Sequence, residues 1–275
     1  MNLRITPLST NVGALVEGFD LRKTADPAAA EAVREAFRRH HMLLIRQRDV
    51  SDVDQVRFAE LFGRISVRHL RANESSQSLT QFVSNSRSDG ILGDGEIVFH
   101  QDHSFYNPPL TAIILYGVQI PPSGSQTKFR NAHTMFLEFP EALRARARKV
   151  RVLHLFNYQG DYTGWQDPAT APADSPRAWQ PLVWTRPGTG EEVLWLSPLS
   201  TVGFEGIGFD DGMKLIGELR AAADAIEARH TVVHTWAPGD LVIWNNLMLQ
   251  HARLPFPANE ARTLRRSAIL ADAAA

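Results

Sequence analysis

The sequence predicts a mainly β protein, a β-sandwich or jelly roll with flanking helices. From residue 97 onward, apolar segments of strand length alternate with turns rich in Pro, Gly and Asn, a spacing typical of such folds. Patterns of helical period occupy two stretches before residue 64 and two after residue 131. The 275 residues allow one sizeable core, and no repeat or low-complexity tract divides them, so we treat 1–275 as one domain.

The first part of the chain predicts helices that lead into strands. Residues 27–40 carry an apolar stripe among Arg and Glu, which predicts an amphipathic helix. The apolar run 41–46 that follows has the length of a strand. A second helix is expected at 51–63, because Ser51 and Asp54 have the spacing of a capping box.

The rest of the chain predicts short strands with two further helices. The helices are expected at about 132–148 and 210–229, where apolar residues recur at helical spacing. The strands are expected at 97–100, 111–119, 126–130, 150–155, 182–184, 192–196, 231–236, 240–244 and 264–270.

Two intervals do not fit this pattern. Residues 71–96 are rich in Ser, Asn, Asp and Gly, whereas 157–180 place Tyr and Trp among Gly and Pro. Long loops inside compact domains are commonly functional lids or disordered. We interpret both intervals as candidate lid loops, and the aromatic content of the second favours a lid.

Composition excludes several kinds of partner. Lys and Arg number 29 against 30 Asp and Glu, so no bulk charge attracts nucleic acid or an anionic membrane. The longest apolar runs are far shorter than the ~20 residues of a membrane helix, and the N-terminus lacks a signal-peptide core. Without cysteine, only nitrogen and oxygen can bind a metal. We expect a cytoplasmic protein, with a homo-oligomer as the usual expectation.

Two distant segments carry candidate metal ligands and charges. His100 and Asp102 end a predicted strand, where residues i and i+2 point to the same side and can meet one ion. This pair alone is unspecific in a chain with ten histidines. His251 follows a predicted hairpin, and Arg262 and Arg266 then share one face of a predicted strand. Inward guanidinium groups require anionic partners; the alternative is a surface strand with solvated charges.

These segments, in this order and spacing, resemble the TauD/TfdA family of Fe(II)- and 2-oxoglutarate-dependent oxygenases. The resemblance covers nearly the whole chain and is carried by Gly13 to Leu21, Phe58 to Gly63, Phe99 to Phe105, Pro121 to Thr127, Pro238 to Asn246 and His251 to Arg266. Two departures occur: Phe99 stands where the family commonly has Trp, and Gly-Ser-Gln-Thr replaces Gly-Gly-Asp-Thr at 124–127. Neither departure removes a ligand.

The resemblance implies a double-stranded β-helix, the cupin-like form of the jelly roll, around a metal. It implies that His100, Asp102 and His251 bind Fe(II) as a facial triad and leave three positions open for 2-oxoglutarate and O2. The resemblance therefore implies the same three residues as catalytic residues and as metal ligands.

The resemblance also implies binding residues for the organic molecules. Thr127 and Arg262 match the residues that bind the far carboxylate of 2-oxoglutarate, a task that suits a planar guanidinium. Arg266 matches a position that lies beside the cosubstrate or meets an acidic group of the substrate. His69 and Asn85 fall where the family often places residues that contact the substrate.

The implied reaction is hydroxylation of an unactivated C–H bond, with release of succinate and CO2. Arg266, with Arg68, His69 and Arg71 at the pocket mouth, favours a small substrate that bears a carboxylate or sulfonate. Aromatic residues of 157–180 would add an apolar wall, so a natural-product intermediate is equally allowed.

Alternative functions remain open at this point. The same oxidant serves desaturation, cyclisation or cleavage of a carbon–heteroatom bond. A non-catalytic metal- or acid-binding jelly roll is another class, and a zinc hydrolase a third, since two histidines and one carboxylate also describe catalytic zinc. Arg262 with Thr127 separates these classes, because a hydrolase has no use for a residue pair that anchors a dicarboxylic keto acid.

Overall fold

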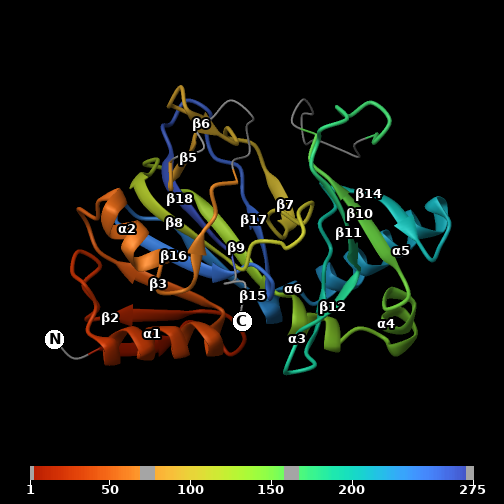
Figure 1. Ribbon diagram of the computed structural model, residues 1–275, viewed down its shortest axis with the longest axis horizontal. Coiled ribbons are helices and arrows are strands. Elements are labelled where there is room, and N and C mark those ends of the chain that lie inside the picture. The colour runs from red at the N-terminus through yellow and green to blue at the C-terminus, as the bar shows by residue number, and fades with distance from the viewer. Residues whose placement is uncertain (1–2, 69–77, 158–166, 271–275) are drawn as a thin grey trace.

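The protein, described here by a computed structural model over residues 3–68, 78–157 and 167–270, has two β-sheets at its centre. Figure 1 shows these sheets with helices α1 and α2 on one side and a group of smaller sheets and helices on the other. Strands of both central sheets contribute to one buried cluster, so the sheets pack face to face. The mainly β fold with a jelly-roll core that the sequence predicted is confirmed.

The two central sheets are built from strands that are distant in sequence. Within the described residues, the larger sheet has nine strands and the smaller has four, all paired antiparallel except β2 with β3 and β5 with β6. In spatial order the larger sheet contains β1 (Arg4–Pro7), β2 (Ala14–Glu17), β3 (Met42–Arg46), β16 (Asp240–Asn245), β8 (Ala112–Gln119), β18 (Thr263–Leu270), β5 (Gln81–Ser84) and β6 (Gly90–Ile91), with β4 (Arg64–Ile65) paired to β18. The smaller sheet contains β15 (Thr231–Thr235), β9 (Gln126–Asn131), β17 (Leu249–Arg253) and β7 (Ile97–His100).

Two helices cover the outer face of the larger sheet. Helix α1 (Pro27–His40) begins after Asp26, whose carboxylate accepts hydrogen bonds from the first free backbone N–H groups. Helix α2 (Asp52–Ala59) begins with the predicted capping box, in which Ser51 and Asp54 each accept from the other's backbone N–H. Both helices therefore start where the sequence predicted.

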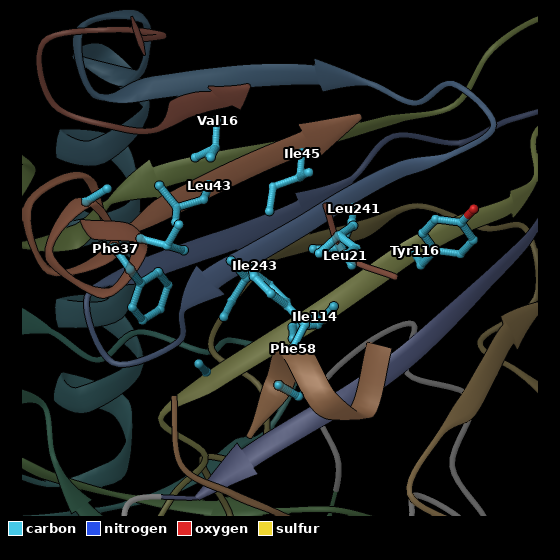
Figure 2. Close-up of a cluster of buried hydrophobic side chains, with 14 of the residues drawn as sticks. Val16, Leu21, Phe37, Leu43, Ile45, Phe58, Ile114, Tyr116, Leu241 and Ile243 are labelled. Carbon is cyan, nitrogen blue, oxygen red and sulfur yellow. The ribbon is translucent and has the colours of Figure 1, made fainter. Parts of the chain in front are cut away.

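The apolar stripes of these helices form the outer core with the sheet (Figure 2). Phe37 of α1 and Phe58 of α2 are buried against side chains of three neighbouring strands, among them Leu43, Ile114 and Ile243. Burial of such side chains is the main favourable contribution to folding.

A second core lies between the two central sheets. Strand β16 is buried on both faces: Leu241 and Ile243 face the helices, whereas Val242 and Trp244 belong to the inner cluster with Phe129 of the smaller sheet. Successive side chains of a strand point to opposite faces, so a continuous apolar run indicates a strand covered on both sides. This inner core forms the base on which the candidate site is built.

The remaining elements lie beside the sheets, where most of them contribute to a third buried cluster. They are β10 (Arg151–Leu155), β11 (Arg177–Pro181), β14 (Thr201–Glu205), β12 (Val183–Thr185), β13 (Glu192–Leu194), α3 (Ala132–Leu137), α4 (Glu141–Ala147), α5 (Phe209–Ala225) and α6 (Glu227–His230). In the part of the chain that the structure describes, no helix is long and apolar enough to cross a bilayer.

Several elements differ from the prediction. The helix expected at 132–148 is divided into α3 and α4 at Pro140, where a proline cannot continue the hydrogen-bond ladder. Strand β17 was not predicted, because its sequence alternates weakly; its buried Gln250 is satisfied by Arg130 of β9 and by the Leu196 carbonyl. These partners are distant in sequence, so no local pattern indicated that a strand containing Gln250 would be buried.

The two candidate lid intervals are not loops throughout. Interval 71–96 contains β5 and β6, and β5 pairs with β18 at the edge of the larger sheet. Interval 157–180 ends in β11, which pairs with β10. Residues 71–77 of the first interval and 158–166 of the second lie outside the described residues.

We expect Phe58→Ala to lower the free energy of unfolding by about 3–5 kcal/mol, because the change leaves a cavity in the outer core. Urea denaturation measures this difference. Val53→Ala on the same helix is the matched control, since Val53 is 66% exposed and its truncation changes stability by less than about 0.5 kcal/mol. Equal losses in both variants would contradict the assignment of Phe58 to the core.

Candidate functional site

Strand pairing in the smaller sheet brings the three predicted metal ligands together. Strands β7 and β17 are antiparallel neighbours, and His100 stands directly opposite His251. The centroids of the two imidazole rings are 4.2 Å apart. Asp102 follows β7, and its Oδ1 lies 3.2 Å from His100 Nε2 and 3.7 Å from His251 Nε2.

The geometry of these three side chains suits a metal ion. One ligand atom from each residue can be chosen so that all lie within 4.8 Å of one another. The Nδ1 of His100 is 2.9 Å from the carbonyl oxygen of Val98. Since a carbonyl only accepts, Nδ1 carries the proton and Nε2 presents its lone pair to the centre. Two nitrogens and one oxygen on one side fit a metal that keeps open positions.

The electrostatics keep Asp102 and His251 in the protonation states that metal ligands need. Burial by itself raises the pKa of Asp102, but the charge of the nearby Arg266 guanidinium acts against it, and this pKa lies well below its usual range. Burial, followed by the neighbouring His100, lowers the pKa of His251 to about 3. Near neutral pH Asp102 is therefore ionised and His251 is neutral, as metal binding requires.

Asn246 fixes the backbone of Asp102. Its side-chain oxygen accepts from the Asp102 N–H at 2.8 Å, and its amide nitrogen donates to the Asp102 carbonyl at 2.8 Å and to the Leu110 carbonyl at 3.0 Å. Asn246 is fully buried. It lies in the turn between β16 and β17, so one amide connects the aspartate to the strand pair that carries His251.

A cavity opens from the triad toward two buried arginines; we call it the polar cavity. Its lining includes His100, Asp102, His251, Thr127, Arg262 and Arg266, together with Arg253. All six residues that the sequence assigned to metal and 2-oxoglutarate thus line one space. Arg266 in β18 and Arg262 just before this strand face the polar cavity. Arg265 points to the opposite side and donates to Gln55, as the alternation of a strand requires.

The surroundings of Arg262 are the strongest indication that the polar cavity binds an anion. The side chain is only 2% exposed, its Nε donates to Ser125 Oγ at 2.7 Å, and its Nη1 has no hydrogen-bond partner among the described residues. Burial, with nearby Arg253, lowers the pKa of Arg262 to about 9, so the group remains charged near neutral pH. An unpaired buried guanidinium is unfavourable unless an anion binds it.

Thr127 and Arg266 complete the polar cavity. Thr127 Oγ1 accepts from the Trp236 indole at 2.9 Å, so the hydroxyl can still donate to a ligand. Arg266 donates to Asp102 Oδ2 at 2.9 Å and to Gln81 at 3.2 Å. It therefore occupies one carboxylate oxygen of Asp102 and leaves the other toward the histidines.

Comparison with known proteins agrees with this geometry. A family model described as taurine catabolism dioxygenase TauD, TfdA family matches residues 4–268. The chain belongs to this family. The sequence prediction of a 2-oxoglutarate-dependent dioxygenase is thereby confirmed.

Individual relatives of the TauD/TfdA family are similar along their whole length. Pentalenolactone F synthase of Streptomyces avermitilis is 28% identical over 95% of this chain and 92% of its own. The alpha-ketoglutarate-dependent 2,4-dichlorophenoxyacetate dioxygenase of Cupriavidus pinatubonensis is 26% identical over 99% of each. A solved taurine dioxygenase from Burkholderia xenovorans superposes with a TM-score of 0.79 at 25% identity, covering 99% of this chain and 90% of that one.

Asn85, one of the residues predicted to contact the substrate, is not brought to the triad. His69 lies outside the described residues. The Asn85 side chain accepts from the Arg262 N–H at 2.9 Å and donates to the Glu260 carbonyl at 2.9 Å, and it lines neither cavity beside the triad. Its position indicates a role in holding the start of β18, since its polar atoms are used by backbone groups.

Sequence reasoning missed Asn246 and Arg253. Arg253 lies two residues after His251, is 7% exposed, and donates to the backbone carbonyls of Leu92, Gly93 and Gly95. It therefore holds the backbone of residues 92–95 in place, and Leu92 of this segment lines the polar cavity. Arg253 could have been inferred from the sequence, because residues i and i+2 of a strand point to the same side and Arg253 follows His251 at this spacing. No local pattern indicated the role of Asn246.

A second cavity, which we call the apolar cavity, also adjoins the metal ligands. It shares His100 and Asp102 with the polar cavity, and its other walls include Phe105, Leu155 and Phe156. Arg68, expected near the substrate, instead donates to the Pro108 carbonyl at 2.6 Å. The triad thus adjoins two spaces of different character.

We expect Asn246→Ala to weaken metal binding about 10- to 100-fold, because Asp102 loses the amide that fixes its backbone. Competition with a metal-binding dye measures this affinity. Gln126→Ala is the control, since the Gln126 side chain bonds only to the Thr235 hydroxyl at the surface. Unchanged metal affinity in Asn246→Ala, with the protein folded, would show that Asp102 needs no such support.

Proposed function

We propose that this chain is an Fe(II)- and 2-oxoglutarate-dependent oxygenase that hydroxylates an unactivated C–H bond of a small organic substrate, with release of succinate and CO2. One observation carries the proposal: a three-ligand metal centre and an unpaired buried arginine line the same cavity. The family and the named relatives, which depend on alpha-ketoglutarate, support the same chemistry.

In this proposal His100, Asp102 and His251 hold the iron. Bound Fe(II) supplies the redox chemistry with O2 and the keto acid that no protein side chain provides. The ionised Asp102 offers Oδ1 to the metal while Arg266 holds Oδ2. The fixed tautomer of His100 presents Nε2 in the same direction, so the ligands are oriented before the metal arrives.

The same cavity would position 2-oxoglutarate. Arg262 and Thr127 would hold the far carboxylate, because a guanidinium forms two parallel charge-assisted bonds with such a group. The ion then satisfies Arg262 Nη1, which the protein leaves unpaired among the described residues. With one end fixed there, the keto acid end reaches the open side of the triad, since both lie along one cavity.

The other functions that the sequence left open have less support. A zinc hydrolase does not need the buried pair of Arg262 and Thr127, and a non-catalytic acid-binding module does not need the three metal ligands beside that pair. Desaturation, cyclisation and carbon–heteroatom cleavage use the same site and stay as alternative outcomes. The cytoplasmic location and a homo-oligomer stay predictions.

The decisive experiment adds Fe(II) and 2-oxoglutarate to the protein without oxygen. A visible absorption band is expected, because the keto acid binds the metal directly. Asp102→Ala is expected to lose this band and all 2-oxoglutarate-dependent succinate formation. A colourless wild-type mixture, or full succinate formation by Asp102→Ala, would overturn the proposal.

The role of Arg262 is tested separately. We expect Arg262→Ala to raise the KM for 2-oxoglutarate about 10- to 100-fold, because a hydrogen bond to a charged group contributes about 1.5–3 kcal/mol. Steady-state succinate release measures KM. Arg229→Ala serves as the matched control, since Arg229 is 62% exposed and pairs with Glu138 away from both cavities. An unchanged KM in Arg262→Ala would exclude the proposed anchor.

A further inference from the structure

Ser125 stands at a position where this chain departs from the TauD/TfdA family. The family commonly has Gly-Gly-Asp-Thr, and this chain has Gly-Ser-Gln-Thr at 124–127. Ser125 comes just before β9, and residues i and i+2 of an extended segment point to the same side. Ser125 and Thr127 therefore present two hydroxyl groups on the face that carries Thr127 into the polar cavity.

The Ser125 hydroxyl contacts Arg262 and does not reach the cavities beside the triad. Ser125 is 2% exposed, and its Oγ accepts from Arg262 Nε at 2.7 Å. It lines neither the polar cavity nor the apolar cavity, whereas Arg262 lines the polar cavity. Any effect of this serine on a ligand in the polar cavity therefore passes through Arg262.

The bond to Ser125 determines which nitrogens of Arg262 remain for a ligand. A guanidinium has five N–H groups in one rigid plane, so a bond at Nε restricts the directions of the two terminal nitrogens. Of these, Nη1 is buried and has no hydrogen-bond partner among the described residues. The Phe256 ring, whose centroid lies 5.4 Å from Arg262 Cζ, is a second fixed contact of the guanidinium. A carboxylate would therefore meet the terminal nitrogens and not Nε.

Trp236 holds Ser125 and Thr127 in register. Its backbone N–H donates to the Ser125 carbonyl at 2.9 Å, which continues the pairing of β15 with β9 by one residue. Its indole N–H donates to Thr127 Oγ1 at 2.9 Å. An indole can only donate, so the Thr127 hydroxyl keeps its proton for a ligand. Trp236 is 3% exposed and belongs to the inner core, so this support is itself fixed.

We propose that Ser125 is a positioning residue for cosubstrate binding, because its hydroxyl holds the Arg262 guanidinium with the terminal nitrogens directed at the far carboxylate of 2-oxoglutarate. This inference rests on the proposed function and adds a residue to it. It gives the serine a task that glycine cannot perform, since glycine has no side chain to accept from Nε. The Thr127 hydroxyl, held by Trp236, supplies a further donor to the same carboxylate.

The experiment measures ligand binding to the Mn(II)-loaded protein by calorimetry, with two ligands that share one metal-binding end. N-Oxalylglycine replaces one CH2 of 2-oxoglutarate by NH and keeps both carboxylates, whereas N-methyloxamate lacks the far carboxylate. We expect Ser125→Ala to weaken N-oxalylglycine binding about tenfold, because the buried Nε of Arg262 loses its acceptor and the guanidinium its orientation. The affinity for N-methyloxamate is expected to stay unchanged.

Ser123→Ala is the matched control. Ser123 lies two residues earlier, is exposed, and donates its hydroxyl to Glu260 instead of accepting from Arg262. Its truncation is expected to change the affinity for neither ligand. Equal weakening of both ligands in Ser125→Ala would indicate a general loss of structure and overturn the proposal, as would unchanged binding of N-oxalylglycine.

A double variant tests whether Ser125 acts through Arg262. In the Arg262→Ala protein, the further change Ser125→Ala is expected to cause no additional loss of N-oxalylglycine affinity, because the effects of residues in one hydrogen-bonded network are not additive. A second loss as large as the one in the wild-type background would mean that Ser125 acts independently, and it would overturn the proposal.

The design separates this inference from the proposed function. A wild-type protein that binds neither ligand with Mn(II), and shows no absorption band with Fe(II) and 2-oxoglutarate, would refute the metal and cosubstrate site as a whole. A normal band, together with N-oxalylglycine binding that Ser125→Ala leaves intact, would refute the positioning role alone and leave the proposed function standing.

Discussion

The antiparallel pairing of β17 with β7 is the constraint on which the candidate site depends. It places His251 opposite His100. The Asn246 side chain then fixes the backbone of Asp102, which follows β7, by two hydrogen bonds. Because hydrogen-bonded strands hold their partners at fixed spacing, three side chains from distant parts of the chain become one preorganised set of ligands. The inner core beneath, with Trp244 and Phe129, keeps that sheet in place.

Buried charge sets the second constraint. Arg253, Arg262 and Arg266 are all nearly inaccessible to water, and such groups destabilise a fold unless each finds partners. Arg253 is satisfied by backbone carbonyls and Arg266 by Asp102 and Gln81, whereas Arg262 keeps one free nitrogen among the described residues. Of these three arginines, Arg262 is the one with an unpaired nitrogen among the described residues. An anionic ligand would therefore bind beside Arg262.

The metal ligands adjoin two environments of different character. Buried arginines line the polar cavity and suit a dianionic cosubstrate, whereas aromatic and aliphatic side chains make up much of the lining of the apolar cavity. His100 and Asp102 belong to both. A dianionic keto acid is favoured in the polar cavity, because an anion that loses its water there gains cationic partners.

The sequence by itself determined the main helices, many of the strands, the jelly-roll class and six of the residues that line the polar cavity. Periodicity and caps are local properties, and the motifs around His100, His251 and Arg262 carry their own spacing. Only the tertiary structure decided that Asn85 holds backbone at β18, that Arg266 pairs with Asp102, and that Asn246 and Arg253 support the site. Those roles depend on which groups meet across strands far apart in sequence, and no local pattern encodes a partner that distant.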